Sequence, residues 1–160
     1  GCGKNDGWKV KETVVNNIAH VLASKKQAPM ASLPPTATVR DALQKMADLE
    51  IGSVLIMQGE ALLGIFTERD YARRIVLKGL SSADALLADV MTARLYVVGP
   101  NQMVEECMDI MTKARVRHLP VVDAGAVIGL VSIGDLVKAK LEEQRFHIEQ
   151  LESYIAGNLA

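Results

Sequence analysis

The sequence predicts a mixed α/β fold (α+β) of two like halves related by a pseudo-two-fold axis, with an additional helix at each end. The main observation is a repeat: residues 39–71 align without a gap on residues 104–136, at a constant offset of 65. In both copies an apolar stripe at helical spacing precedes two short apolar runs separated by a turn. Both copies end on a hydroxyl residue followed three residues later by an aspartate, Thr67 with Asp70 and Ser132 with Asp135. Two such halves can form two equivalent clefts, each holding one hydroxyl and one carboxylate.

The composition indicates a well-packed protein without a nucleic-acid or membrane partner. The chain has 160 residues, of which 49% are apolar, so it is one compact domain or two closely packed subdomains. A net charge of −1 and scattered basic residues argue against a long nucleic-acid-binding face. We find no apolar run near the roughly 18 residues of a membrane helix and no secretory signal. Cys2 and Cys107 form no disulfide framework, and we therefore expect a reducing compartment and a cytoplasmic location.

The first half of the chain is expected to contain an N-terminal helix and the first copy of the repeat, over residues 9–80. Residues 1–8 are interpreted as a flexible tail or the remnant of an expression tag. Val14, Ile18 and Val21 recur at helical spacing, which predicts an amphipathic helix over residues 9–24. The elements expected after it are a helix from Val39 with Thr38 as N-cap, a strand at 53–57, a turn at 58–60, a strand at 62–67 and a helix at 68–78.

The second half, residues 81–160, is expected to repeat this order. The polar connection over residues 79–89 includes a short predicted helix at 83–87. A brief strand at 95–98 precedes the second copy, and an equivalent strand is expected before the first. The elements that follow are a helix at 103–114, a strand at 117–122, a turn at 123–125, a strand at 127–132 and a helix from 133 to about 155.

The last predicted helix carries a partial heptad pattern beyond the end of the repeat. Its members alternate at spacings of four and three residues, with one polar position: Val137, Leu141, Gln144, Ile148, Leu151 and Ile155. Two interpretations stay open at this point. The seam packs back on its own chain, or it contacts a second copy in a homodimer.

The hydroxyl–x–x–aspartate pattern has a chemical and a purely structural interpretation. At the end of a strand where a helix begins, free backbone amides favour anionic groups. A carboxylate there can accept hydrogen bonds from both hydroxyls of a ribose, the Ser or Thr can contact the ribose or first phosphate, and apolar strand residues such as Val54 and Ile56 can hold a base. The same pattern also matches a helix capping box, which needs no ligand.

Several longer motifs resemble a known family, the cystathionine-β-synthase (CBS) motifs, and the pair resembles a Bateman module. The likeness rests on V-x-x-A-L-x-x-M at 39–46, RHLPVVD at 117–123 and both Gly…Thr/Ser-x-x-Asp endings. It is closer still to stand-alone bacterial CBS-pair proteins and their plant organellar relatives, through ERDYAR at 68–73, SIGDLV at 132–137 and IEQLESYI at 148–155. The resemblance covers roughly residues 14–157.

This resemblance implies a fold, a class of ligand and a set of contacts. The fold would be two βαββα-type halves packed sheet to sheet, usually paired into flat dimers that can regulate a partner protein. The ligand would be an adenosine nucleotide: AMP first, with ADP, ATP, NAD or S-adenosylmethionine as further candidates. Thr67 and Asp70 would hold the ribose in one cleft, and Ser132 and Asp135 in the other. The remaining expected contacts are the polar Thr36 and Asn101, the phosphate candidates Arg69, Arg115, Arg117 and His118, and the strand residues Val54, Val116, Leu119 and Pro120. For His118, packing within a strand is an equally open interpretation.

The two clefts are not expected to be electrostatically equal, because Glu50, Gly52 and Ser53 stand where the second copy has Arg115, Arg117 and His118. The leading hypothesis is a regulatory module that senses adenosine nucleotides and signals to a dimer or a partner. The alternative is a constitutive dimerisation or interaction module with non-functional clefts. We do not expect an enzyme, because we find no nucleophile–base pairing, no metal-ligand spacing and no glycine-rich dinucleotide fingerprint.

Overall fold

The computed structural model describes residues 16–25 and 30–159. The predicted tail and residues 9–15 of the predicted N-terminal helix lie outside the described residues. The elements of the first copy are β1 (Ser32–Leu33), α2 (Val39–Leu49), β2 (Ser53–Gln58), β3 (Ala61–Thr67), α3 (Glu68–Asp70) and the π-helix η1 (Tyr71–Val76). The elements of the second copy are α5 (Val104–Ala114), β4 (His118–Asp123), β5 (Ala126–Ser132) and α6 (Ile133–Leu159). The flanking helices are α1 (Ile18–Ser24) and α4 (Leu87–Val90).

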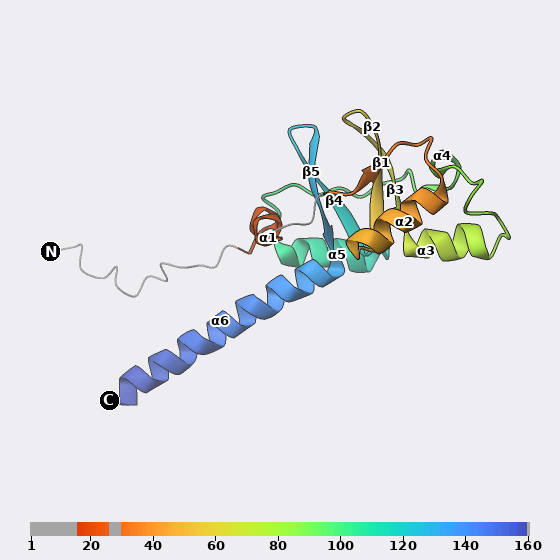
Figure 1. The fold of residues 1–160 in the computed structure, drawn as a ribbon. Coiled ribbons are helices and arrows are strands. Elements are labelled where there is room, and N and C mark those ends of the chain that lie inside the picture. Colours follow the sequence, from red (N-terminus) through yellow and green to blue (C-terminus); the bar gives the residue numbers. More distant parts are fainter. Residues whose placement is uncertain (1–15, 26–29, 160) are drawn as a thin grey trace.

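The two copies form two small sheets that follow the same plan (Figure 1). Strands β2 and β3 form an antiparallel hairpin extended by the parallel strand β1, and β4 and β5 form the second hairpin. The register is conserved at the offset of 65, since Leu33 pairs with Ile56 and Val98 pairs with Val121. Even the β-bulge recurs, after Ile56 in one hairpin and after Val121 in the other. The predicted α+β fold of two like halves is therefore confirmed.

The flanking helices are exchanged between the copies. α1 buries Ile18 and Val21 in the core of the second copy, whereas α4 buries Leu87 and Val90 in the core of the first. The backbone contacts match: Ile18 N donates to Gln102 O, and Leu87 N donates to Ala37 O, both at 2.9 Å. Each copy is therefore completed by a helix that lies outside the 33-residue repeat. Leu22 of α1 and Lys25 just after it line the large cleft, and Thr92, which follows α4, lines the small cleft.

Four predicted elements differ from the structure. The N-terminal helix begins at Ile18, because Asn17 is extended, pairs with Met103 and caps the helix through its side chain. The short helix predicted at 83–87 lies at Leu87–Val90, where its apolar residues reach the first core. In place of the strand predicted at 95–98, only Val98 pairs, as a single parallel bridge. The helix predicted over 68–78 exists as one α-turn followed by η1.

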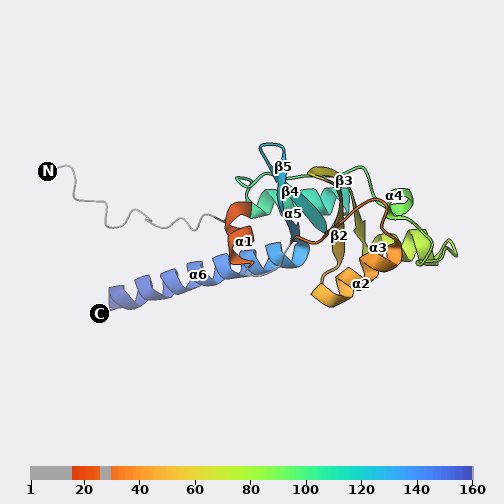
Figure 2. The same ribbon diagram turned by 45° about the horizontal axis from the view of Figure 1, so that its top comes forward.

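Helix α6 leaves the body of the molecule after its first turns (Figure 1). α1 lies beside the first part of α6 (Figure 2). Just before α1, Asn16 Nδ2 donates to Ala139 O at 3.2 Å and to Glu143 Oε2 at 2.7 Å, both on α6. Lys140 forms an ion pair with Glu105 of α5. The heptad residues of α6 are not the residues that make these contacts, and the apolar ones among them are 39–62% exposed. Within the described residues the seam therefore does not pack back on its own chain.

Candidate functional site

The structure forms one cleft at each hydroxyl–x–x–aspartate ending, and each cleft lies between the two copies. The large cleft, of about 620 Å³, contains Ser132 and Asp135 of the second copy and Glu50–Ser53 of the first. The small cleft, of about 300 Å³, contains Thr67 and Asp70 of the first copy and Arg115–His118 of the second. The crossed arrangement follows from the packing of the halves about their pseudo-two-fold axis.

Asp135 sits at the start of α6 and is only partly engaged. Its Oδ2 accepts from Ser132 N at 2.8 Å, and Ser132 Oγ accepts in return from Asp135 N at 3.2 Å, which completes a capping box. Lys25 Nζ lies 2.8 Å from the same Oδ2 and donates to Leu130 O at 2.9 Å. Burial alone would raise the pKa of the Asp135 carboxyl, but the hydrogen bonds from Lys25 and Ser132 outweigh burial and lower the pKa. Among the described residues, no hydrogen-bond donor reaches Oδ1.

Asp70, the equivalent residue in the small cleft, is closed off. Its Oδ2 accepts from Thr67 N at 3.0 Å and from the Thr67 hydroxyl at 3.2 Å. Its Oδ1 accepts from the Thr92 hydroxyl at 3.1 Å and lies 3.8 Å from Arg74 Nε. Arg74 is held in turn by the carbonyls of Val90 and Met91, at 2.9 and 2.8 Å. Asp70 is 8% exposed, and each of its oxygens accepts at least one hydrogen bond from inside the protein.

The exchanged flanking segments cause this difference. In the first copy, Thr92 forms a two-bond bridge with Ile65 and presents its hydroxyl to Asp70. In the second copy, α1 occupies the corresponding place and presents Lys25. A lysine at the end of a flexible stem leaves one carboxylate oxygen accessible, whereas the fixed threonine covers its carboxylate.

The clefts also differ in charge, as the sequence predicted. Arginines line the small cleft: Arg69, Arg73, Arg74, Arg115 and Arg117. The large cleft has Lys25 as its only lining lysine or arginine among the described residues, opposed by Glu50 and Asp135. Its apolar lining residues are Leu22, Met30, Ala31, Leu49, Ile51, Ile128, Leu130 and Ile133.

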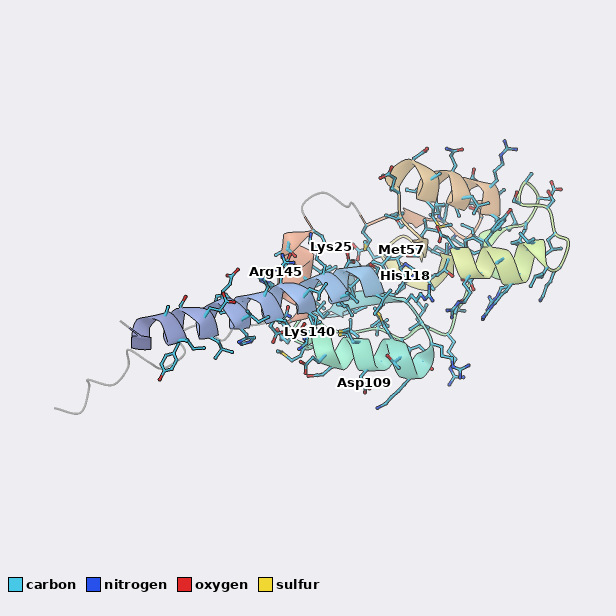
Figure 3. All side chains as sticks on the ribbon, turned by 90° about the horizontal axis from the view of Figure 1, so that it is seen from below. Lys25, Met57, Asp109, His118, Lys140 and Arg145 are labelled. Atoms are coloured by element: carbon cyan, nitrogen blue, oxygen red, sulfur yellow. The ribbon has the colours of Figure 1, made fainter. Side chains whose placement is uncertain are left out.

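His118 lines both clefts, as does Gly52. Figure 3 labels His118 where the two halves of the molecule meet. Burial lowers the pKa of His118, and the neighbouring cations Lys25 and Arg117 act in the same direction against the opposing charge of Asp135. At neutral pH the imidazole is therefore neutral and can offer one donor and one acceptor.

Some residues expected at the ligand lie away from the clefts. Thr36 and Asn101 are exposed and line neither cleft. Val54, Leu119 and Pro120 are buried, and Val54 and Leu119 belong to the two cores, because every second residue of a hairpin covered by helices points inward. Of the predicted strand contacts, Val116 lines the small cleft.

Sequence reasoning missed the residues that distinguish the clefts: Lys25, Thr92, Arg73 and Arg74. A usable signal was present, because IAHVLA at 18–23 is similar to LADVMT at 87–92, at an offset of 69. This second correspondence marks α1 and α4 as equivalent flanking segments. It would have placed residues near Ala23 and Thr92 beside the two aspartates.

The described residues contain no cluster of three or more His, Cys, Asp or Glu side chains that could hold a metal ion. In the same part of the chain, no helix combines the length and apolar character needed to cross a membrane.

Comparison with known proteins identifies the repeat. The family model for the CBS domain matches residues 22–77 and again residues 87–142. The mitochondrial CBS domain-containing protein CBSX3 of Arabidopsis thaliana is 40% identical over 125 residues, which are 75% of this chain and 61% of that protein. The chain thus spans less than two thirds of CBSX3, whereas its match to YhcV of Bacillus subtilis, at 27% identity, covers 72% of this chain and 81% of that protein.

Solved structures agree with this result. A protein with CBS domains from Burkholderia ambifaria MC40-6, provisionally assigned to signal transduction, is 42% identical and superimposes with a TM-score of 0.75 over 80% of this chain and 96% of its own. The CBS domain protein PAE2072 from Pyrobaculum aerophilum was solved in complex with AMP. It is 24% identical, with a TM-score of 0.69 over 81% of this chain and 98% of its own, and so shows likeness of fold alone. With two matched copies at the positions of the internal repeat, the chain belongs to the CBS domain family and is a tandem CBS pair.

Proposed function

We propose that this CBS pair is a cytoplasmic regulatory module, without catalytic activity, that binds an adenosine nucleotide in the large cleft. AMP is the first candidate, and ADP, ATP, NAD and S-adenosylmethionine are the others. Binding would alter a homodimer or a surface that a partner protein recognises. The observation that carries this proposal is the half-engaged carboxylate of Asp135 at the mouth of a cleft of about 620 Å³.

The chemistry of the large cleft suits a nucleoside. Asp135 Oδ1 can accept from a ribose hydroxyl, and the Ser132 hydroxyl lies beside it. The apolar residues that line the cleft offer faces for a flat base, and the volume falls within the usual range for small-molecule sites, roughly 300–1,000 Å³. The AMP complex of PAE2072 supports an adenosine ligand as a starting point.

The test is a thermal-shift and calorimetry screen with AMP, ADP, ATP, NAD and S-adenosylmethionine, with GMP as control. The protein must first be shown to be free of co-purified nucleotide. A ligand at 100 times its dissociation constant should stabilise the fold by about 2.7 kcal/mol. We expect Asp135→Ala to abolish this shift and Asp84→Ala, at an exposed loop position, to retain it. Absence of a shift with all five ligands would refute the proposal.

The exposed seam of α6 favours a homodimer. In the regulatory function the dimer would transmit nucleotide binding, and in the alternative function dimerisation itself would be the role of the module. The seam spans residues 137–155, and no described helix of this chain other than α6 itself is long enough to cover it. A spacing of three and four residues is typical of helices that pair with another helix of the same pattern. We therefore propose that α6 contacts α6 of a second copy.

Disulfide trapping tests this pairing in a background with Cys2→Ser. We expect Ile148→Cys, on the seam, to yield a cross-linked dimer, and Glu142→Cys, off the seam, to yield little. Equal cross-linking at both positions would contradict α6 pairing. A dimer that forms without any response to nucleotides would instead favour the constitutive interaction module.

A further inference from the structure

Four arginines surround a groove that adjoins the small cleft and extends it outward. The groove has a volume of about 580 Å³ and is lined by Arg69, Arg73, Met111, Ala114, Arg115, Val116 and Arg117. No acidic residue is among them. The four guanidinium-bearing residues are all exposed, so their charged groups are available to a ligand.

Each copy of the CBS motif contributes two of these arginines. Arg69 and Arg73 lie one helical turn apart, on α3 and η1. Arg115 and Arg117 lie on the turn that follows α5, where Arg115 has the left-handed backbone of a helix C-cap, with φ 56°. Arg69 Nη1 donates to Arg115 O at 2.7 Å and ties the two pairs together. The cluster is therefore fixed by tertiary structure rather than by one flexible segment.

Among the described residues, no ion pair joins an acidic side chain to any of these four arginines. Glu68 and Asp70 line the small cleft, but Asp70 is already bound by Thr67, Thr92 and Arg74. Four guanidinium-bearing side chains around one groove repel one another, and an anion bound between them would relieve that repulsion. Guanidinium groups bind phosphate through paired hydrogen bonds, which makes phosphate the anion this arrangement fits best.

A nucleoside fits the small cleft poorly. Both oxygens of Asp70 already accept hydrogen bonds inside the protein and the residue is 8% exposed, so it offers a ribose far less carboxylate surface than Asp135 does. The small cleft has about half the volume of the large one, at about 300 Å³ against about 620 Å³. The two CBS motifs have thus diverged: one cleft has the carboxylate for a ribose, and the other has the cations for phosphate.

We propose that the small cleft and the arginine groove form a site for a chain of phosphate groups and not a second nucleoside site. The chain would be the tail of a nucleotide whose nucleoside lies in the large cleft, or a free polyphosphate. His118 and Gly52 border both clefts and mark the route by which a tail passes from one to the other. The tail version rests on the proposed nucleotide binding, and the free-polyphosphate version does not.

The test is calorimetry with adenosine, AMP, ATP and tripolyphosphate. The variants are Arg73→Gln/Arg117→Gln, and Arg40→Gln/Arg94→Gln as the matched control at exposed positions outside the groove. We expect the unmodified chain to bind ATP at least about tenfold more tightly than AMP, or to bind tripolyphosphate in the absence of a nucleoside. In the groove variant Arg73→Gln/Arg117→Gln, the affinity for ATP or for tripolyphosphate should fall by about tenfold. If the double variant fails to fold, the same calorimetry is done with the single variant Arg73→Gln, which changes one exposed side chain.

The outcomes separate the two sources of phosphate. An ATP advantage without tripolyphosphate binding identifies the tail of a nucleotide, and tripolyphosphate binding without AMP binding identifies a free chain and refutes only the nucleotide proposal. Equal affinity for AMP and ATP with no tripolyphosphate binding would overturn the inference. An advantage that survives unchanged in the groove variants would overturn it as well.

Discussion

The pseudo-equivalent glycines Gly64 and Gly129 test whether the exchanged flanking segments differ in rigidity as the structure indicates. A Cβ at Gly64 would lie 2.7 Å from Met91 Sδ and 2.8 Å from the backbone oxygen of Thr92. A Cβ at Gly129 would lie 2.7 Å from Cδ2 and 3.1 Å from Cδ1 of Leu22. The closest approach is the same in the two copies, but the obstacles differ in kind.

The obstacle at Gly64 cannot move without breaking other contacts. Thr92 O accepts from Ile65 N at 3.0 Å and Thr92 N donates to Ile65 O at 2.9 Å, so moving Thr92 disrupts both bonds. At Gly129 the obstacle is the tip of the Leu22 side chain, which lines the large cleft and can rotate into it. Neither glycine has a left-handed backbone, so alanine causes no backbone strain at either position.

The magnitudes follow from these differences. Overpacking destabilises a protein by about 1–3 kcal/mol, and each lost hydrogen bond adds about 1 kcal/mol. Replacing Gly by Ala also stabilises the fold by about 0.4–1 kcal/mol, because it lowers the conformational entropy of the unfolded chain. We expect Gly64→Ala to lower the free energy of unfolding by about 2–4.5 kcal/mol, because both bonds to Thr92 are disturbed, and Gly129→Ala by about 1 kcal/mol or less, because the Leu22 side chain can rotate away. Urea unfolding at 25 °C measures both losses, provided that the m-value, the slope of the unfolding free energy against urea concentration, is the same in the variants as in the wild type. Equal losses, or a larger loss for Gly129→Ala, would refute the assignment of a fixed wall to one cleft and an adjustable wall to the other.

Three further predictions concern single groups. Thr38→Ala removes the capping box of α2, in which Thr38 and Asp41 exchange bonds of 3.0 and 3.2 Å, and should cost about 1 kcal/mol in urea unfolding, whereas Thr38→Ser should cost little. Burial raises the pKa of the Cys107 thiol to about 11, so in a Cys2→Ser variant a thiol reagent at pH 8 should label it only upon unfolding; rapid labelling of the folded protein would contradict its burial. The pKa of Asp135 is lowered in the folded state, so its contribution is complete above the ordinary value of 3.8 and is lost as the pH falls below that value and through the lower pKa of the folded state. The difference in unfolding free energy between the wild type and Asp135→Asn should therefore shrink between pH 6 and pH 3, and a difference that grows would show that the sign is wrong.

The sequence by itself determined the repeat and most of its local structure. The offset of 65, the capping pattern at Thr38 and the apolar runs of the hairpins depend on short-range periodicity and on side chains that bond their own backbone. The same pattern located Asp70 and Asp135 correctly at helix starts, where both form capping boxes whether or not a ligand binds. The capping interpretation that the sequence left open is thus confirmed, and it is compatible with a ligand at Asp135 Oδ1, which no donor from residues 16–25 or 30–159 reaches.

Only the tertiary structure decided which aspartate is available and where the cations gather. Lys25 reaches Asp135 across 110 positions of sequence, and Arg69 reaches Arg115 across 46. These contacts exist because each half takes its flanking helix from outside the repeat, and because the halves face one another across the pseudo-two-fold axis. Local propensity carries no information about such pairings, since they depend on how two cores pack together. Two equivalent hydroxyl–x–x–aspartate endings consequently lie in two different clefts, one with a partly engaged carboxylate and one lined by arginines.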